Sequence, residues 1–400
     1  MSQSKERTGK PALLKELNIG LIMDALQKKG QATRVELAAL TNLSQPTVNL
    51  LIGELVKDQT VLSLGIAEST GGRRAEVFAL NAKRAALAAI VIKQDRIEAV
   101  VTDLNLHSEL HELRMRSEGA SCTEELFSLL RLLVEKRPEI RAVCVGVPGS
   151  VSAEGEVFSI PMIPEWEHFA LKNELESRFP VLVCVMNDMN AIAAGYLPDC
   201  AEREEEQRRN FVYLHAEGAG MGAGIVIDGR LYSGFRSFAG EVGSMMLGTA
   251  EKAAEVTKAA EVTEAAEVAQ AAEVTETAEV AKAAGSRAGR EEQKTKISPE
   301  TAYSEVSVEG HMRNAADHAQ RIAILTAAAV NLICVLNPEE ILFGGEVTKK
   351  AAAEISEGCR AYLPETVLPR FQVIADYQKD YFNGLCRQGR ELLSRHIQVV

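Results

Sequence analysis

The sequence predicts a layered α/β protein with a small helical domain at its N-terminus, and three observations support this. Between residues 85 and 400, apolar strand-like runs alternate with helical runs, which is typical of sheets with helices on their faces. Between residues 13 and 80, helical periodicity is followed by two short β-patterns. The 400 residues and their 46% hydrophobic content allow two or three domains with buried cores.

Charge is distributed unevenly along the chain. The net charge of −12 argues against a general nucleic-acid binder. Residues 1–80, however, hold 10 Lys and Arg against 8 Asp and Glu, whereas the remainder holds 34 against 48. A slightly basic N-terminal domain on an acidic body is expected of a DNA reader that carries a large domain with another task.

The cysteines and the polar N-terminus exclude several classes of protein. The 7 cysteines are scattered without a CxxC pair, so neither a disulfide framework nor a zinc module is expected. The start MSQSKERTGK lacks the apolar core of a signal peptide, and no apolar run approaches the roughly 18–20 residues of a membrane helix. We expect a cytoplasmic protein with no membrane partner and no bound metal.

The N-terminal domain is predicted to begin with three helices. The first covers residues 13–28, and its apolar residues share one face: Leu14, Leu17, Leu21, Ile22, Ala25 and Leu26. A short second helix is predicted over 34–41, followed by a turn at Asn42 and Leu43. Ser44 is a suitable N-cap for the third helix, with Pro46 in its first turn.

The third helix carries the predicted DNA-reading surface. Its buried face would consist of Val48, Leu51, Ile52, Leu55 and Val56. Polar residues would then point outward near its N-terminus: Ser44, Gln45, Thr47 and Asn49. A helix-turn-helix reads base edges from that part of its recognition helix.

The two β-patterns, VLSLGIA and AEVFALN, predict a wing joined by ESTGGRR. The glycine pair permits a tight bend, and Arg73 and Arg74 could contact phosphates or the minor groove. The alternative is a helical bundle or protein-docking module with a hairpin. Because helices, wing and tip arginines occur together, we predict a winged helix-turn-helix that binds DNA at residues 1–82, with the body at 83–400.

The body is predicted to contain seven strands and several helices. The strand-like runs lie at 86–92, 97–103, 142–148, 181–186, 211–216, 223–228 and 340–345. The helical runs lie at 123–136, 168–178, 188–197 and 313–335.

Five body segments, in order, resemble motifs of the ROK family (repressor, open reading frame, kinase). They are VGVPGSV (145–151), NDMNAIAAG (187–195), GAGMGAGIVIDGRLYSG (218–234), FAGEVGSM (238–245) and NPEEILFGGEV (337–347). Each motif is weak alone, and their order is the specific signal. The resemblance implies a two-lobed fold of the actin-like ATPase and sugar-kinase type. With the winged domain in front, it implies a sugar-responsive repressor that acts as a homodimer.

Asn187 and Asp188 open a helical run directly after a short apolar strand pattern. In the family's kinases, the aspartate of this motif takes the proton from the sugar hydroxyl, and Asp188 occupies that position. The pair also suits simple sugar binding, because carboxylate and amide groups complement paired hydroxyls. Asp188 as a helix N-cap is the third interpretation. We favour sugar contact, with Asp188 a vestigial base.

Both phosphate-binding motifs of the kinases are altered. Where the family carries a D-x-G-x-T-type loop, this chain has no glycine between residues 85 and 118, so bulky side chains at 93–96 replace the phosphate cradle. The second motif survives as GAGMGAG, with Ala219 in place of a threonine, and is expected to be a tight β-turn. We therefore predict neither an enzyme nor a nucleotide cofactor.

The sugar-binding side is altered less. Glu241 matches the glutamate of the family's G-E-x-G-H motif, whereas Ser244 replaces its histidine and Met162 stands near the position of an asparagine. The predicted ligand-binding residues are Asn187, Asp188 and Glu241. Between the lobes they would hold a sugar or sugar phosphate, and lobe closure would alter the spacing of the two DNA-binding domains.

The family's zinc motif is replaced by an insert at about 249–298. No cysteine occurs between residues 200 and 334, and residues 253–284 repeat a hexapeptide such as AAEVTE. Six residues advance about 240° around a helix, so no single apolar stripe forms, and a solvated helix or flexible insert is expected. A docking arm is the alternative. His311, expected before a helix, and His318 are predicted to be surface or packing residues rather than metal ligands.

Three hypotheses follow. The first is a cytoplasmic sugar-responsive repressor that binds a palindromic DNA operator as a homodimer. The second is a sugar kinase with a DNA-binding domain, which must explain the missing glycine loop. The third is a ligand-independent DNA-binding dimer, favoured by the changes at Met162 and Ser244 and opposed by Asn187, Asp188 and Glu241.

Overall fold

The structure is a computed structural model that describes residues 6–66, 75–117, 119–158, 160, 163–197, 210–247 and 306–396. The chain divides into two compact units. The first comprises residues 1–209, 224–239 and 376–400, and the second comprises residues 210–223 and 240–375. The hexapeptide repeat, Met162 and the wing arginines Arg73 and Arg74 lie outside the described residues.

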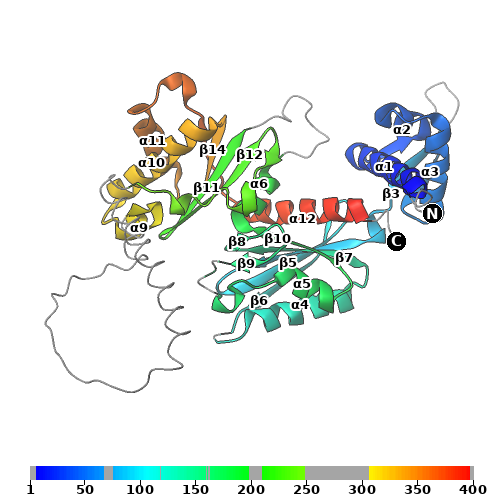
Figure 1. Cartoon of the computed structure of the whole chain (residues 1–400), viewed down its shortest axis with the longest axis horizontal. Helices are drawn as coiled ribbons and strands as arrows, with labels where there is room; N and C mark the ends of the chain where they lie inside the picture. The colour runs from blue at the N-terminus through cyan, green and yellow to red at the C-terminus, as the bar shows by residue number, and fades with distance from the viewer. Residues whose placement is uncertain are drawn as a thin grey trace, which may run out of the picture. The chain divides into compact units, whose positions relative to one another are not determined.

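The N-terminal part of the first unit is a winged helix-turn-helix, as predicted (Figure 1). Its helices are α1 (Glu6–Lys29), α2 (Arg34–Thr41) and α3 (Gln45–Lys57). Its antiparallel sheet has the order β1-β3-β2, formed by β1 (Gln31–Thr33), β2 (Val61–Ile66) and β3 (Glu76–Leu80). The short strand β1 was not predicted.

We call this N-terminal domain the head. Its core includes only part of the apolar face predicted for α1. Ile22, Ala25 and Leu26 are buried, together with Leu37, Val48, Ile52 and Phe78. The prediction was wrong for Leu14, Leu17 and Leu21, whose exposed fractions are 59%, 57% and 47%. Helical periodicity identified apolar positions on α1 but did not distinguish a face that packs inside the domain from one that does not.

The turn between α2 and α3 follows the sequence chemistry closely. Thr33 and Glu36 form a reciprocal capping box at the start of α2. The helix ends at Asn42, whose φ of 56° lies in the left-handed region. Asparagine tolerates this backbone conformation better than most residues. Ser44 then caps α3, and Pro46 lies in its first turn, as predicted.

The first lobe of the body is built on a five-stranded sheet with the order β10-β7-β4-β5-β6. Strands β4 (Ala86–Ile92), β7 (Ile140–Val147) and β10 (Leu182–Asn187) are parallel neighbours. Strands β5 (Arg96–Asp103) and β6 (Ser108–Met115) extend the sheet antiparallel. β6 was not predicted, because its partly exposed edge position gives the polar sequence SELHELRM.

Helices cover both faces of this sheet (Figure 1). On one face, α4 (Cys122–Lys136) and α5 (Leu171–Arg178) bury Leu126, Leu130 and Leu175 against it. On the other face, α6 (Asp188–Tyr196) packs along α12 (Tyr377–His396), which returns from the end of the chain. Short pieces β8 (Ser150–Val151), β9 (Val157–Phe158) and η2 (Pro164–Trp166) connect β7 to α5.

A second five-stranded sheet has the order β13-β12-β11-β14-β15. Its strands are β11 (Phe211–Glu217), β12 (Gly220–Ile227), β13 (Arg230–Leu231), β14 (Glu340–Gly345) and β15 (Arg370–Val373). The short helices η3 (Phe235–Ser237) and η4 (Val242–Ser244) follow β13. Helices α10 (His318–Leu336) and α11 (Lys349–Arg360) pack on the sheet in the second unit, and η5 (Glu365–Val367) leads into β15.

The predicted helix at 313–335 is two helices. α9 (Val308–Asn314) ends before Asp317, whose side chain caps α10. His311 therefore lies inside a helix rather than before one. By length and composition α10 could cross a membrane, contrary to the sequence prediction that no run approaches this. Leu325, Ala328 and Ile333 of α10 are, however, buried in the core of the second unit, as expected for a core helix.

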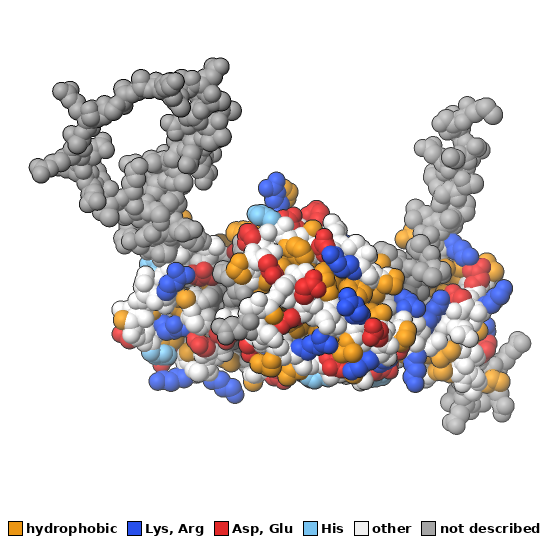
Figure 2. Space-filling model, turned by 90° about the horizontal axis from the view of Figure 1, so that it is seen from below, with side chains coloured by type: hydrophobic (Ala, Val, Ile, Leu, Met, Phe, Trp, Pro, Cys, Tyr) orange, Lys and Arg blue, Asp and Glu red, His pale blue; other side chains and the backbone are white. Residues whose placement is uncertain are grey.

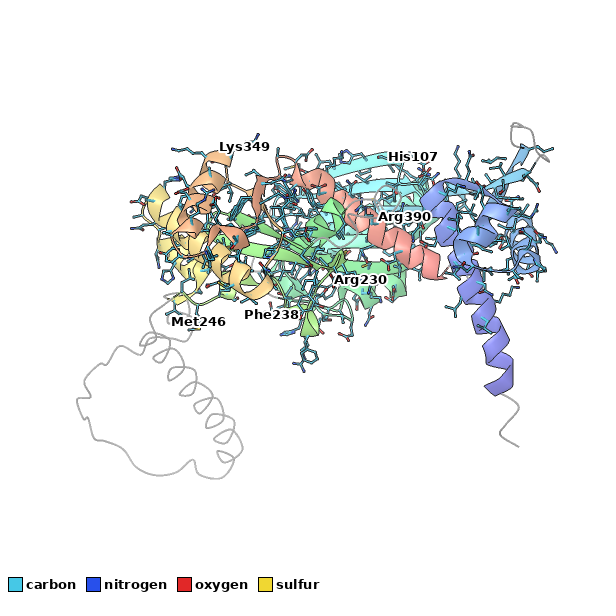
Figure 3. All side chains as sticks on the ribbon, turned by 90° about the horizontal axis from the view of Figure 1, so that it is seen from above. His107, Arg230, Phe238, Met246, Lys349 and Arg390 are labelled. Atoms are coloured by element: carbon cyan, nitrogen blue, oxygen red, sulfur yellow. The ribbon has the colours of Figure 1, made fainter. Side chains whose placement is uncertain are left out.

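The described residues on either side of 248–305 are hydrogen-bonded to each other. The backbone N–H of Leu247 donates to the carbonyl of Val306 at 2.7 Å, and that of Val308 donates to Met245 at 2.8 Å. Met246, labelled in Figure 3, forms an antiparallel bridge with Ser307. Residues 247 and 306, on either side of the stretch outside the described residues, therefore lie side by side.

Candidate functional site

The outward face of α3 has a different composition from the one predicted. Val48, Leu51, Ile52 and Leu55 are buried as expected. Gln45 and Thr47 are half-buried at the sides of the helix, and Asn49 is exposed. The Thr47 hydroxyl lies 2.8 Å from the Ser44 hydroxyl, which also accepts from the Thr47 N–H at 3.3 Å. Ser44 and Thr47 thus serve the helix cap, and Asn49 is the most accessible of the predicted base readers.

Two apolar residues on the same outward face were missed. The Leu50 side chain is 64% exposed in the middle of α3. Gly53, one turn later, has no neighbouring atom within 4 Å of where a Cβ would lie. An exposed leucine on a recognition helix can contact a thymine methyl group, and a glycine lets the helix lie close to DNA. An aliphatic residue in a run of leucines gave no signal of this in the sequence.

The base of the wing is held by an ion pair. Arg34, the first residue of α2, donates to Glu76 of β3 at 2.7 Å, and its guanidinium stacks over Phe78. The Ser63 hydroxyl donates to the other Glu76 oxygen at 2.7 Å. These two hydrogen bonds, from Ser63 and then Arg34, hold the pKa of Glu76 below its usual value. The wing strands are therefore fixed to the helix that precedes the recognition helix.

Charged side chains of both signs lie on the described surface. Basic and acidic side chains are interspersed over the face of the molecule shown in Figure 2. Where the head is described, Lys15, Lys29 and Arg34 are each paired with a glutamate. Phosphate contacts by Arg73 and Arg74 remain a prediction, since these residues lie outside the described ones.

The helix N-cap after β10 is Asn187, so the interpretation of Asp188 as the cap is wrong. The Asn187 side-chain oxygen accepts from the Asn190 N–H at 3.1 Å. Its amide nitrogen donates to the carbonyl of Gly149 at 3.0 Å, which ties the loop after β7 to the end of β10. The side chain of Asn187 therefore joins two neighbouring parallel strands at their carboxyl ends, where α/β folds bind ligands.

Asp188 is the first residue of α6 and is half-buried. One of its carboxylate oxygens accepts from the Met189 N–H at 2.8 Å. Beside it, Tyr381 of α12 is fully buried, and burial together with the negative charge of Asp188 raises the pKa of this phenol well above its usual value. The Tyr381 ring lies against the backbone of Gly146 in β7, where a Cβ would be 2.4 Å away.

The helix that carries Asp188 is clamped by close backbone contact with α12. A Cβ on Gly195 would lie 1.7 Å from the carbonyl oxygen of Asp380, and one on Gly384 would lie 1.8 Å from that of Ala191. Arg387 donates to the carbonyls of Ala194 and Leu197 at the C-terminal end of α6. Each helix thus provides a glycine where the two backbones cross, and the end of β10 is held rigidly.

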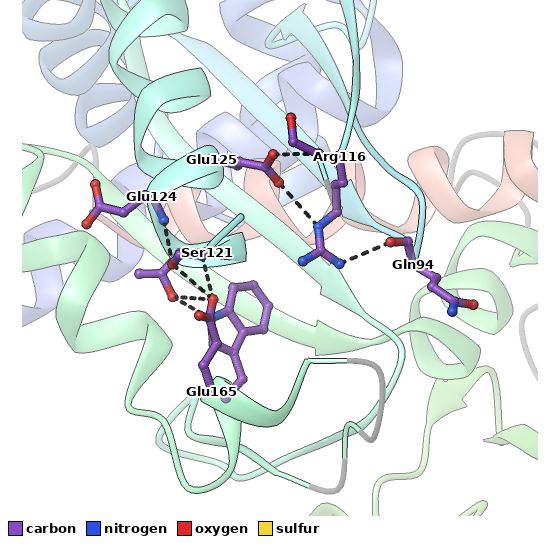
Figure 4. A network of polar contacts seen from close by, with 9 residues as sticks. Gln94, Arg116, Ser121, Glu124, Glu125 and Glu165 are labelled. Carbon is purple, nitrogen blue, oxygen red and sulfur yellow. Dashed lines mark hydrogen bonds and ion pairs between the residues drawn. The ribbon is translucent and has the colours of Figure 1, made fainter. Parts of the chain in front are cut away.

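The loop that would cradle phosphate in the first lobe is a tight hairpin between β4 and β5. The Lys93 N–H donates to the carbonyl of Arg96 at 2.9 Å. Arg116 donates to two backbone carbonyls of this loop. Its side chain donates to the carbonyl of Gln94 at 3.1 Å (Figure 4), and its N–H donates to the carbonyl of Asp95 at 2.8 Å. Arg116 is in turn paired with Glu125 of α4 at 3.3 Å. The described loop is thus closed by its own bonds.

The glycine motif of the second unit is also a turn, as predicted, and it holds an internal carboxylate. Gly218 and Ala219 join β11 to β12. The Gly218 N–H donates to a carboxylate oxygen of Glu346 at 3.2 Å, and Arg321 donates to the Gly218 carbonyl at 2.8 Å. Arg321 and Glu346 pair with each other at 3.2 Å. A backbone N–H that could face a phosphate is therefore bonded to an anion of the protein.

Glu241 lies in the second unit, in the short loop that leads into η4. Gly240, with a φ of 99°, accepts from the Ala223 N–H at 2.8 Å through its carbonyl. On the other side, the carboxyl group of Glu309 in α9 packs against the Cα of Gly243. Sequence analysis missed Glu309, which places a second carboxylate at this loop. Ser244 is exposed and forms the last residue of η4.

His311 and His318, which were predicted not to bind a metal, each have a polar partner within the protein. His311 bonds the carbonyl of Ser307 at 2.8 Å, and His318 pairs with Glu354 at 2.6 Å. Within the described ranges, no group of three or more His, Cys, Asp or Glu residues could hold a metal ion.

Comparison with known proteins identifies the family. Residues 87–372 match the ROK family, and residues 18–61 match a winged helix-turn-helix DNA-binding domain. The chain belongs to the ROK family. Its fold is that of the ROK family transcriptional regulator described as a homolog of the E. coli MLC protein, with a TM-score of 0.65 and 17% identity over 96% of this chain and 99% of that one.

Two relatives have the names of regulators. The xylose repressor of Caldicellulosiruptor bescii is 29% identical over 243 residues, which are 59% of this chain and 60% of the repressor. The DNA-binding transcriptional dual regulator NagC of Escherichia coli K12 is 25% identical over 253 residues, 60% of this chain and 59% of the regulator. The chain thus spans about three fifths of the length of these relatives.

Proposed function

We propose that this ROK protein is a cytoplasmic, sugar-responsive transcriptional repressor. The observation that carries the proposal is a combination of three features. The head has a recognition helix, α3, with an exposed outward face. In the body, Asn187 and Asp188 remain at the end of β10, and the turn at Gly218 is closed by Glu346 and Arg321. The names of the relatives, a xylose repressor and a DNA-binding transcriptional dual regulator, support the same conclusion. The domain boundary is placed near residues 82 and 83, and the protein acts as a homodimer on a palindromic operator.

In the proposed DNA complex, α3 enters the major groove. Asn49 and Gln45 read base edges, Leu50 contacts a thymine methyl group, and Arg73 and Arg74 bind the backbone or minor groove. Selection of bound duplexes from a random pool tests this. Leu50→Ala should relax preference at one position by roughly 1–3 kcal/mol, whereas Arg73→Ala should weaken binding to all duplexes alike.

In the body, Asn187, Asp188 and Glu241 contact the hydroxyls of the effector, a sugar or sugar phosphate. Asn187 supports this assignment because its cap and its bond to Gly149 fix its orientation. Asp188 supports it because its carboxylate is half-buried yet accessible at a strand end. Effector binding changes operator affinity only to the extent that the effector prefers one arrangement of the protein.

Sugar phosphorylation is the competing function, and Glu346 argues against it. Its carboxylate lies at the Gly218 N–H and pairs with Arg321, so a nucleotide phosphate would have to displace an internal ion pair. The hairpin at 93–96 argues in the same direction. We therefore assign no enzymatic activity and no nucleotide cofactor to the body.

The deciding experiment is a thermal-shift screen of the full chain against pentoses, hexoses, amino sugars and their phosphates. A ligand at about 100 times its Kd should stabilise the protein by roughly 2.7 kcal/mol. Asp188→Ala should abolish the shift. Glu135→Ala, which removes an exposed carboxylate from α4, should retain it and serves as the matched control.

Each result separates the hypotheses. A shift lost only in Asp188→Ala, with release of DNA on adding the same sugar, supports the repressor. A shift in both variants places the effector elsewhere. Absence of any shift leaves a ligand-independent DNA-binding dimer, and turnover of ATP with the bound sugar would establish a kinase.

A further inference from the structure

Helix α1 is apolar on two sides, and the head core uses one of them. Ile22 and Leu26 are fully buried, and Met23 and Ala25 nearly so. Leu14, Leu17 and Leu21 remain about half exposed on the same helix. At about 100° per residue, the mean direction of these three leucines lies roughly 125° around the helix from that of the buried residues. The leucines therefore form a separate stripe.

The stripe has the spacing of a coiled-coil seam. Leu14, Leu17 and Leu21 are three and four residues apart, which corresponds to positions a, d and a of a heptad. The positions that continue the seam are occupied by Lys10 and Asp24, seven residues before and after Leu17. The apolar seam is thus short, centred on Leu17, and bounded by opposite charges.

This arrangement fits the same helix of a second copy, running antiparallel. A two-fold axis at Leu17 would place Leu14 against Leu21 and Lys10 against Asp24 of the partner subunit. A parallel pair would instead place like charges opposite each other at both ends of the seam, which is unfavourable. The exposed ion pair between Asp24 and Lys28 on α1 leaves the Asp24 carboxylate more than half exposed, so it is accessible to the partner.

The seam is too small to hold a dimer alone. Three leucines on each copy cover far less than the about 1,600 Å² that a stable interface usually buries. Two heads already joined through a larger interface, however, meet at a high effective concentration, and a small contact then forms readily. The long α1, which extends from the rest of the head in Figure 3, is placed to make such a contact.

We propose that the heads of two copies pair through antiparallel α1 helices at Leu14, Leu17 and Leu21, and that this contact fixes the spacing of the two recognition helices. The inference rests on the proposed function for the existence of a dimer. It adds the surface through which the heads meet, and it makes α1 the element that sets the distance between operator half-sites.

Cysteine cross-linking of the full chain tests the seam. In Leu17→Cys, the two new thiols lie near the two-fold axis, and a mild oxidant such as diamide should join them in a disulfide, taking up the two electrons and two protons released. Lys15→Cys, exposed on another side of α1, is the matched control, and the wild type reports background from its native cysteines. The expected result is a covalent dimer with Leu17→Cys alone.

A charge exchange tests the antiparallel direction. Lys10→Glu or Asp24→Lys alone should weaken binding to a two-half-site duplex, obtained by selection with the wild type, by severalfold. The double variant should restore it, because opposite charges again face each other. The same variants are also measured on a duplex with a single half-site. If their affinity for it changes by the same factor as for the two-half-site duplex, α1 acts only through its own head, and the proposal is overturned.

The outcomes distinguish this inference from the proposed function. A wild-type dimer that binds the two-half-site duplex, without cross-linking in Leu17→Cys, overturns the seam and leaves the repressor intact. A monomeric wild type that selects no duplex overturns both. Cross-linking together with rescue by the double charge exchange supports both.

Discussion

The end of β10 and the turn after β11 carry two of the segments that resemble motifs of the ROK family, and they differ in how they are built. At the end of β10, Asn187 and Asp188 sit on a helix clamped by the glycine crossing of α6 and α12. At the turn, Gly218 is bound by Glu346 and Arg321, both partly exposed. The end of β10 thus carries polar side chains on a closely packed helix, whereas the turn after β11 is filled by the protein's own charges.

Under the proposed function, this difference explains how such a fold would lose an activity and keep a binding site. A phosphate site depends on backbone N–H groups that converge on an anion, so one internal carboxylate and the loss of flexible glycines suffice to disable it. A hydroxyl site depends on side chains held at a strand end, and that geometry is supported by packing elsewhere in the lobe.

The largest expected effect is at the helix crossing that supports the strand end. Gly195→Val should destabilise the first unit by about 3 kcal/mol or more, because its Cβ would overlap the Asp380 carbonyl and force the backbones apart. Urea unfolding followed by circular dichroism measures this. Gly53→Ala, with open space around it, should not destabilise and is the control. Equal stability of the two variants would mean that the crossing is not close.

Tyr381→Phe sharpens the electrostatic side of the comparison. Among the described residues, the buried Tyr381 hydroxyl has no hydrogen-bond partner and lies near the Asp188 charge. Its removal should be neutral or stabilise the fold by up to about 1 kcal/mol. Fluorescence of Trp166, the only tryptophan and fully buried in this lobe, reports the unfolding. A clear loss of stability would show that the hydroxyl has a partner in solution.

Arg321→Met acts on the phosphate side. The Arg321 and Glu346 side chains are 31% and 60% exposed, so their pair should contribute no more than about 1 kcal/mol. The turn itself should loosen, which faster hydrogen exchange at the Gly218 N–H would reveal. Lys350→Met, from the more exposed pair with Glu354, is the control and should leave Gly218 exchange unchanged. Unchanged exchange in Arg321→Met as well would contradict the described turn.

The smallest effect lies in the head, outside both regions. Hydrogen bonds from Lys29 and from the Thr33 backbone lower the pKa of Glu36 to about 2. Because the folded pKa is depressed, the stabilisation is present above about pH 4.5 and is lost as the pH falls toward 2. With the side chain 45% exposed, it should be below about 1 kcal/mol. Glu36→Gln should reduce the pH dependence of the free energy of unfolding across this window, which urea titrations at several pH values measure. If the pH dependence is unchanged, it arises from other carboxylates.

Most of the fold could be predicted from the sequence where burial is complete. β4 and β7 are buried along nearly their whole length and gave continuous apolar runs, and β10, although only partly buried, gave one as well. β6 and β15 lie at sheet edges, and their polar sequences gave no such signal. α12 was missed although it buries Tyr381, Leu385 and Leu393, because polar and charged residues such as those in RQGRE interrupt its apolar positions.

The site could be predicted only in part, because its details depend on local geometry. The motif order indicated Asn187 and Asp188, but the cap belongs to Asn187 through its bond to Asn190. Glu346 is far from Gly218 in sequence, and nothing in its neighbourhood predicted their bond. Leu14, Leu17 and Leu21 were placed on one face with the buried Ile22 and Leu26, because periodicity does not tell an internal face from one left exposed.

The bridge between Met246 and Ser307 has a consequence for how this chain can change length. Because the bridge holds the residues on either side of 248–305 together, we expect a change in the length of that stretch to cost about 0.6 kcal/mol of loop-closure free energy per doubling of length. The hexapeptide repeat at 253–284 could therefore gain or lose units with little penalty to the second unit. The same position offers a place to graft a fluorescent reporter into the second unit.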